Sequence, residues 1–237
     1  MRKNSFQKLV WYFFIYSFLG MLLENAFCLL TSLKIESRKG FIIGPFCPIY
    51  GFGAIILTIL LSKYSFYSNK KEEKINKIKV FFLGIVYGSA FEYLSSYVMQ
   101  AIYGIEFWDY TNMKFNLNGR TSLFFALCWG IVSFFLIFYV NKAVDKFIKK
   151  FNSKPLAYIM ATYMLINASL TYLSINNYVN EANLKINNTN TKAYIKKYDT
   201  INNPFYSLMT TEVMKKVYPN MILVLDDNNK IKMSDLF

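Results

Sequence analysis

Apolar residues gather in long blocks along the chain, and segments rich in lysine and asparagine separate these blocks. A helix needs about 20 consecutive apolar residues to cross the hydrocarbon core of a bilayer. The pattern predicts spans over residues 9–33, 80–103, 121–140 and 156–173, and a further span that begins within 38–53 and ends near Leu61 or Ser62. We therefore expect an all-α, polytopic integral membrane helix bundle with about five transmembrane helices.

The segment from Arg38 to Gly53 interrupts the helical pattern with two prolines and four glycines. Proline removes a backbone donor, and glycine admits turns that other residues resist. Irregular backbone is tolerated at membrane depth only where it is buried in protein or lines a wet cavity. We expect a broken or re-entrant segment that forms the wall of a site. The candidate turn residues are Gly44, Pro45, Cys47, Pro48, Tyr50 and Gly51.

Two polar segments separate later spans. Residues 63–79 hold six lysines and two glutamates, which predicts a hydrophilic loop or an interfacial helix. Residues 141–153 place apolar and basic side chains on different faces of a helix, as interfacial helices do. The apolar face consists of Val144, Phe147, Ile148 and Phe151.

The composition changes at Asn176 to asparagine, lysine and short apolar clusters. We expect a transmembrane domain over 1–175 and a polar C-terminal tail over 176–237. Within this tail, the apolar clusters 221–225 and 230–233 flank a polar turn and predict a small hairpin. The tail is therefore either an extended segment or a small α+β element.

Charge sets the expected orientation. The net charge is +13, but the basic residues lie between apolar blocks and form no single face for nucleic acid. In membrane proteins, basic loops stay on the cytoplasmic side. This rule predicts a cytoplasmic amino terminus, with segments 63–79 and 141–154 on the same side and the loops 34–48 and 104–120 facing outward.

The composition also limits the chemistry. The chain has no histidine, and its three cysteines show no paired spacing, so no metal site and no cofactor is expected. A glycine-rich phosphate loop ending in Lys-Ser or Lys-Thr is missing too, so this chain is not itself an ATPase. The first apolar block is longer than a signal-peptide core and is expected to be retained.

Glu24 and Glu92 lie inside predicted spans, where a charge costs several kcal/mol unless it faces a cavity or a partner. Each lies about 14 to 16 Å inward from the outer end of its span, so the two could meet. One interpretation is a structural network in which the carboxyl groups bond to tyrosines or pair with Arg120. The other is direct contact with transported or processed material.

The loop 104–120 is rich in aromatic and amide side chains. Trp108, Asp109 and Tyr110 suit a loop at headgroup level, where aromatic rings are typical. Asn116, Asn118 and Arg120 form a donor set suited to a carboxylate, a phosphate or a polar headgroup. The alternative is a loop capped by its own side chains.

Four short motifs follow one another along the chain: Gly40-Phe41, the run from Gly44 to Gly51, the triplet Trp108 to Tyr110, and the run from Asn116 to Arg120. With these motifs the chain resembles the bacterial family of ABC-transporter type IV, or CmpB-like, membrane proteins over roughly residues 10–170. The resemblance implies a polytopic protein of the bacterial cell membrane. It also implies a permease component with a separate ATPase subunit as partner, and leaves the substrate open.

Three functions remain in view. The first is a transport component, and the second is a membrane-embedded enzyme acting on a lipid or isoprenoid headgroup at the outer surface. In the enzyme, Glu24, Glu92, Asp109 and Arg120 would supply acid, base and anion-binding groups. The third is a scaffold or sensor. The small residues from Gly84 to Ala90 predict close helix packing, either with a second copy or within the chain.

Overall fold

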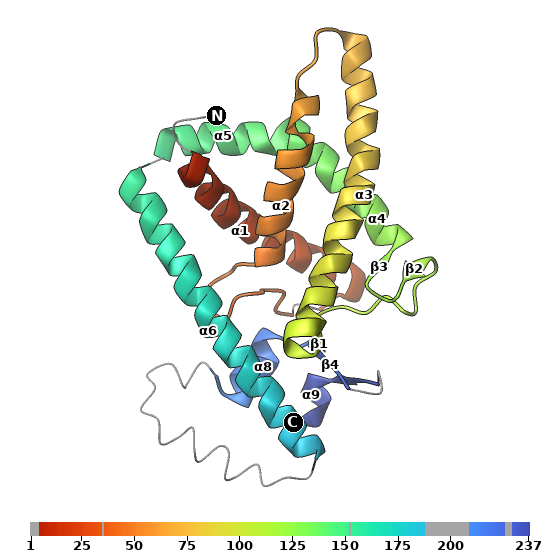
Figure 1. Ribbon diagram of the computed structural model, residues 1–237, viewed down its shortest axis with the longest axis vertical. Coiled ribbons are helices and arrows are strands. Elements are labelled where there is room, and N and C mark those ends of the chain that lie inside the picture. Colours follow the sequence, from red (N-terminus) through yellow and green to blue (C-terminus); the bar gives the residue numbers. More distant parts are fainter. Residues whose placement is uncertain (1–4, 35, 152, 188–208, 226–228) are drawn as a thin grey trace. The chain divides into compact units, whose positions relative to one another are not determined.

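The computed structural model describes residues 5–34, 36–151, 153–187, 209–225 and 229–237 (Figure 1). Within these residues, five helical segments are long and apolar enough to cross a membrane. They are Phe6–Ser32, Pro48–Ser65, Lys70–Tyr103, Leu123–Phe151 and Lys154–Ile186. The expected all-α helix bundle with five spans is confirmed.

The helices follow one another along the chain, and the long connections 33–47 and 104–122 separate α1 from α2 and α3 from α4. The long helices are α1 (Ser5–Ser32), α2 (Pro48–Leu61), α3 (Lys70–Tyr103), α4 (Leu123–Phe135), α5 (Asn141–Phe151) and α6 (Lys154–Ile186). A 3₁₀ turn, Ser62–Ser65, follows α2, and a π-helical turn, Leu136–Val140, joins α4 to α5. Figure 1 shows that the chain changes direction between α4 and α5. A π-helical turn often bends a helix in this way.

Two helices extend beyond the predicted spans. The third span was expected to begin near Val80, but α3 begins at Lys70. The fifth was expected to end near Leu173, but α6 continues to Ile186. Its last turns remain amphipathic, with Tyr178 and Ala182 buried under residues of the tail. Hydropathy marks the apolar part of a helix, whereas backbone hydrogen bonding continues through the polar part.

Short strands complete the fold. The strands β1 (Ile105–Glu106), β4 (Ile222–Val224) and β5 (Lys230–Lys232) form an antiparallel sheet in the order β1-β4-β5. The pairing of β4 with β5 is the predicted hairpin. Glu106 is 3% exposed, and its Oε2 atom lies 2.7 Å from Lys230 Nζ. The ion pair therefore ties β5 to β1 across the sheet.

The described chain divides into two compact units. The first unit comprises Met1–Gly20, Cys47–Ser95 and Asp109–Met164, and the second comprises Met21–Phe46, Ser96–Trp108 and Leu165–Phe237. Their boundaries fall within α1, α3 and α6, just before α2, and in the loop after α3. Each unit has its own apolar core.

In the first unit, α3 packs closely on α4. A Cβ atom added to Gly84 would lie 2.4 Å from Ser133 Cβ, and one added to Gly88 would lie 2.5 Å from Trp129 Cβ. Such distances leave no room for a side chain, so both positions require glycine for this packing. The small-residue face predicted from the sequence is therefore used within the chain.

Basic elements meet at one end of the first unit. Lys8 Nζ on α1 lies 2.8 Å from Asp145 Oδ1 on α5, and Tyr12 donates to the same carboxylate at 2.7 Å. The Asn141 amide of α5 donates to Thr58 near the end of α2 at 3.2 Å. The start of α1, the end of α2 and α5 therefore share one end, as the charge pattern requires.

The amphipathic helix α5 packs one side of its apolar face on the first unit. Val144 and Ile148 are buried, whereas Phe147 and Phe151 remain exposed. Its lysines lie on the other faces. This arrangement suits the predicted interfacial helix, whose exposed aromatic side chains would enter the lipid while the lysines stay in water.

Candidate functional site

The connection between α1 and α2 turns back on itself. The N–H groups of Gly40 and Phe41 both donate to the carbonyl oxygen of Phe46, at 2.9 and 3.1 Å. Gly44 has a φ angle of +77°, a conformation that favours glycine. Residues 36–46 therefore form a closed turn in the second unit, and no helix forms within them. We call this segment the re-entrant loop because its chain turns back on itself.

Asn167 of α6 holds this loop. Its Oδ1 atom accepts from the Ile43 N–H at 3.2 Å, and its Nδ2 atom donates to the Ile43 carbonyl at 2.6 Å. One residue earlier, the N–H of Ile42 donates to Thr171 Oγ1 at 3.0 Å. Asn167 is only 1% exposed. Helix α6 thus supplies hydrogen-bond partners to the loop's backbone, as a neighbouring strand would. Irregular backbone needs such partners wherever it lies at membrane depth.

The C-terminal part of the second unit contacts the re-entrant loop as well. Tyr218 donates its hydroxyl proton to the Gly40 carbonyl at 2.9 Å. The amide of Asn220 donates to Glu36 Oε2 at 3.1 Å. The loop is therefore fixed by side chains from two other parts of the unit.

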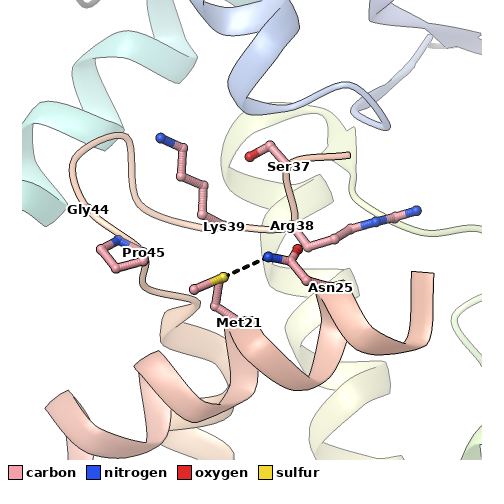
Figure 2. Close-up of a pocket in the computed structure, with 7 residues that line it drawn as sticks. All are labelled: Met21, Asn25, Ser37, Arg38, Lys39, Gly44 and Pro45. Carbon is pink, nitrogen blue, oxygen red and sulfur yellow. Dashed lines mark hydrogen bonds between the residues drawn. The ribbon is translucent and has the colours of Figure 1, made fainter. Parts of the chain in front are cut away.

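A cavity of about 310 Å³ lies between the re-entrant loop and α1, within the second unit (Figure 2). The lining residues are Met21 and Asn25 from α1 and Ser37, Arg38, Lys39, Gly44 and Pro45 from the loop. Three polar atoms of these residues are buried and make no hydrogen bond among the described residues: Asn25 Oδ1, Ser37 Oγ and Arg38 Nε. Two of the lining residues, Arg38 and Lys39, are cationic, and their side chains point in different directions (Figure 2).

Glu92 forms a second polar cluster, in the first unit. Its side chain lies on α3, and the residue is 6% exposed. The Tyr110 hydroxyl donates to Glu92 Oε1 at 3.1 Å, and the Thr121 hydroxyl donates to Oε2 at 2.7 Å. The Tyr110 ring stacks on Phe125 at 4.4 Å between centroids. The structure thus brings Glu92 and Tyr110 together and adds Thr121, which the sequence did not single out.

Asn116 and Asp109 support the loop that carries them. The Asn116 amide donates to the carbonyls of Thr111 and Met113 at 3.1 and 2.8 Å and accepts from the Gly119 N–H at 3.0 Å. Asp109 Oδ1 accepts from the Thr111 N–H at 2.9 Å. These bonds match the alternative in which the loop is capped by its own side chains.

Asn118 and Arg120 converge on Tyr93, a residue that the sequence analysis missed. The Asn118 amide donates to the Tyr93 hydroxyl at 3.0 Å, and the Arg120 guanidinium lies 5.9 Å from the centroid of the Tyr93 ring. Tyr93 follows Glu92 on α3. In the sequence, only its position next to the acidic Glu92 within a predicted span could have pointed to Tyr93.

The other turn residues begin α2 and pack against α1 in the first unit. The Cys47 N–H donates to the Ser17 carbonyl at 2.9 Å, and Pro48 occupies the first turn of α2, where a missing N–H costs least. A Cβ atom added to Gly51 would lie 2.3 Å from Ser17 Oγ. The Tyr50 ring stacks on Trp129 at 6.1 Å. These four residues position the start of α2.

Glu24 and Trp108 belong to the second unit, whereas Glu92, Asp109 and Arg120 belong to the first. The proximity of Glu24 to Glu92 and the coupling of both to Arg120 therefore stay predictions. Among the described residues, no group of three or more histidine, cysteine, aspartate or glutamate side chains could hold a metal ion.

No curated protein and no solved structure matches the chain. One protein family, described as "Putative ABC-transporter type IV", matches residues 11–175. The match includes the re-entrant loop, the start of α2, Glu92 on α3 and the loop that carries Tyr110. It covers well over half of the 237 residues and agrees with the resemblance carried by the sequence motifs. The chain therefore belongs to this ABC-transporter type IV family of membrane proteins.

Proposed function

We propose that this protein is a permease component of a transporter in the bacterial cytoplasmic membrane, energised by a separate ATPase subunit. The observation that carries the proposal is the re-entrant loop, whose backbone bonds to Asn167 and Thr171 and borders a polar cavity. Transporters place substrate sites where helices are interrupted and irregular backbone lines a cavity. The family assignment supports the same function.

In this proposal, ATP is hydrolysed by another chain. The sequence has no glycine-rich phosphate loop with the lysine that holds nucleotide phosphates. Exposed lysines on α5, among them Lys142, Lys146 and Lys149, offer a basic surface at the end of the first unit where α1 begins. We propose that the ATPase docks on this surface.

The same end of the first unit supports the proposed orientation. Lys77, near the start of α3, lies 5.9 Å from the Phe138 ring in the π-helical turn. Glu92 lies about four turns further along α3. Its partner Thr121 lies just before α4, in the short strand β3 (Thr121–Ser122). Because basic segments stay inside, the amino terminus would be cytoplasmic and the loop around Tyr110 would face outward.

The enzyme alternative has weaker support from the geometry. A general acid or base must exchange a proton with its substrate, so its oxygens need access to that substrate. Both oxygens of Glu92 accept hydrogen bonds from side chains, and Asp109 accepts one from its own loop. This arrangement suits structural carboxylates better than catalytic ones.

Co-purification tests the proposal. The tagged chain would be expressed in its native host, extracted in mild detergent and analysed by mass spectrometry. We expect an ATPase subunit with a glycine-rich phosphate loop to co-purify. Changing Lys142, Lys146 and Lys149 together to glutamate should abolish this association, because the basic docking surface is reversed.

A matched control changes Lys114, an exposed lysine in the loop after α3, to glutamate. This variant should keep the ATPase, because Lys114 lies in the loop that is proposed to face outward. A strictly monomeric protein that captures no ATPase would contradict the transporter proposal, and so would equal association of the triple variant and wild type.

A further inference from the structure

We propose that the hairpin end between α2 and α3 docks on a soluble protein whose acidic surface carries an apolar pocket. This end, residues 62–79, comprises the 3₁₀ turn after α2, the connection that follows it and the first turns of α3. We call it the basic hairpin. It belongs entirely to the first unit, and the inference holds whether or not the partner is the ATPase of the proposed function.

The basic hairpin reaches past the membrane end of the first unit. Helix α3 has 34 residues and a length of about 51 Å, whereas the hydrocarbon core is about 30 Å thick. The apolar part of α3 begins at Val80, so the segment 70–79 extends about 15 Å further. The headgroup layer takes up only about 5–8 Å of this length. Figure 1 shows the connection and the first turns of α3 extending past the interfacial helix α5.

Hydrogen bonds fix the turn of the basic hairpin. Glu72 Oε2 accepts from the N–H and the hydroxyl of Ser68 at 2.9 and 2.7 Å, and Asn69 Oδ1 accepts from the Glu72 N–H at 2.9 Å. These bonds cap the start of α3. The buried Asn76 donates to the Phe66 carbonyl at 3.2 Å. The turn is therefore preorganised, which lowers the entropic cost of binding a partner.

The same turn exposes two aromatic rings. Phe66 is 77% exposed, and its neighbour Tyr67 is exposed as well. Asn76, which holds the Phe66 backbone, lies about 6 Å beyond Val80 along α3, so both rings lie in the outer part of the headgroup layer or beyond it, where acyl chains do not cover them. Aromatic side chains on a fixed, solvated turn are typical anchors of protein interfaces. We therefore expect Phe66 to enter an apolar pocket of the partner.

Charge selects an acidic partner. The basic hairpin holds six lysines and two glutamates, and both glutamates are used within it. Glu72 caps the start of α3, and Glu73 Oε1 lies 2.6 Å from Lys77 Nζ. The hairpin of a second copy would carry the same charge and be repelled, whereas acidic side chains around a pocket would attract it. The exposed lysines near the start of α3 are Lys70, Lys71 and Lys74.

Photocrosslinking in living cells tests the proposal on the full-length protein. Benzoylphenylalanine, a photoreactive analogue of phenylalanine, would replace Phe66. We expect it to crosslink one soluble protein, which mass spectrometry identifies and whose surface is acidic. The control places the same analogue at Phe115, which is exposed to a similar degree in the loop after α3 and should not crosslink this protein.

Reversing the charge of the hairpin should reduce this crosslinking. Lys70→Glu and Lys71→Glu together should lower the yield at position 66 by about tenfold, because they repel an acidic surface. The two changes preserve the hairpin, since acidic side chains are favourable in the first turn of a helix. Lys114→Glu, in the loop after α3, is the matched control and should leave the yield unchanged.

Binding of the purified partner is the decisive measurement. The captured protein would be purified, and its Kd for the full-length chain in detergent would be measured. Phe66→Ser should raise this Kd by about tenfold or more, because a central aromatic anchor carries much of the binding energy of an interface. The variant should melt as wild type does, since Phe66 is exposed. Raising the salt from about 0.05 to about 0.3 M should weaken the binding as well.

The proposal is overturned if position 66 crosslinks only to lipid, only to a second copy of this chain, or to nothing. It is also overturned if the captured protein crosslinks equally to the charge-reversed variant, or if it binds Phe66→Ser as tightly as wild type. Failure of an ATPase to co-purify overturns the proposed function alone, whereas these results overturn docking by the basic hairpin alone.

Discussion

Asn167 shows how a single amide can make a non-helical segment compatible with a membrane protein. Its side chain presents an acceptor and a donor in the same spacing as a peptide group, and both bond to the backbone of Ile43. Helix α6 can therefore hold irregular chain although its own backbone groups are used within the helix. An amide side chain within an apolar span thus acts as a hydrogen-bond partner for backbone groups in this protein.

Replacing this amide should destabilise the fold. Asn167→Leu removes both hydrogen bonds to the N–H and C=O groups of Ile43, at about 0.5–1.5 kcal/mol for each bond. We expect a clearly lower melting temperature in detergent, measured by the loss of helical circular dichroism. The control is Asn183→Leu, an exposed position on the same helix, which should change little. Equal melting of the two variants would contradict the role of Asn167.

The bonds around Glu92 lead to a second prediction at this scale. Glu92→Ala removes the acceptor of the Tyr110 and Thr121 hydroxyls, and Tyr110→Phe removes one of the donors. Because the two residues are in contact, their effects on the free energy of unfolding should differ from additivity by about 0.5–3 kcal/mol. Chemical denaturation of both single variants and the double variant measures this difference.

Tyr139→Phe supplies the comparison, since Tyr139 is exposed on the π-helical turn. It should combine additively with Glu92→Ala. A purely additive result for Tyr110 and Glu92 would show that their hydrogen bond contributes nothing to stability.

At the scale of elements, hydropathy predicted the number of spans and the end of α2 near Leu61, but it gave only the range 38–53 for the start of α2. It placed the start of α3 and the end of α6 incorrectly, because it reports where a helix is apolar. The amphipathic period identified the segment that forms α5, including the buried Val144 and Ile148. These features are local, and each depends on a few neighbouring residues.

The candidate sites were less predictable for a physical reason. An acidic residue within a span drew attention to Glu92, but its partner Thr121 lies across a loop whose fold the sequence does not specify. Asn116 has the chemistry of a ligand-binding residue and is used to close its own loop. The polar atoms of Asn25 and Ser37 became noticeable only once the turn brought the two residues to one cavity.

The close packing of α3 on α4 leads to a prediction about the stability of this helix pair. Gly84→Ala places a Cβ atom 2.4 Å from Ser133 Cβ and 2.5 Å from Ser133 Oγ, so the helices must move apart. Overpacking of this kind costs about 1–3 kcal/mol. Ser133→Gly removes both contacting atoms and should recover much of the loss when combined with Gly84→Ala.

Thermal unfolding in detergent of the two single variants and the double variant tests this compensation. Ala90→Leu is the control, because Ala90 is exposed on the same helix and has room for a larger side chain. A double variant that is as unstable as the sum of its singles would contradict the packing of Gly84 on Ser133.

For the whole molecule, the distribution of charge links the fold to the membrane. Basic residues lie at the starts of α1 and α3 and on α5, and a carboxylate of α5 joins α1 to this group through Lys8. Asymmetry of this kind fixes the direction in which spans are inserted. The loop after α3 would then lie on the other side, together with its exposed residue Met113.

Thiol labelling tests this orientation. In a variant without the three native cysteines, a cysteine at Lys70 should be protected from a membrane-impermeant reagent in intact cells, and one at Met113 should react. Both should react after the membrane is permeabilised, which controls for accessibility. Labelling of both from outside, or of Lys70 alone, would contradict the proposed orientation.

The sheet formed by β1, β4 and β5 has a consequence for the order in which the protein is made. Ile105 pairs with Leu223, so the ribosome releases β1 long before its partner strand exists. At roughly 5–20 residues per second, this delay is on the order of ten seconds. During that time the nascent chain has neither the β4 strand nor Lys230 beside Glu106. Insertion of the five spans can therefore run ahead of folding, and an insertion chaperone or a quality-control protease would meet the loop after α3 while its edge is still open.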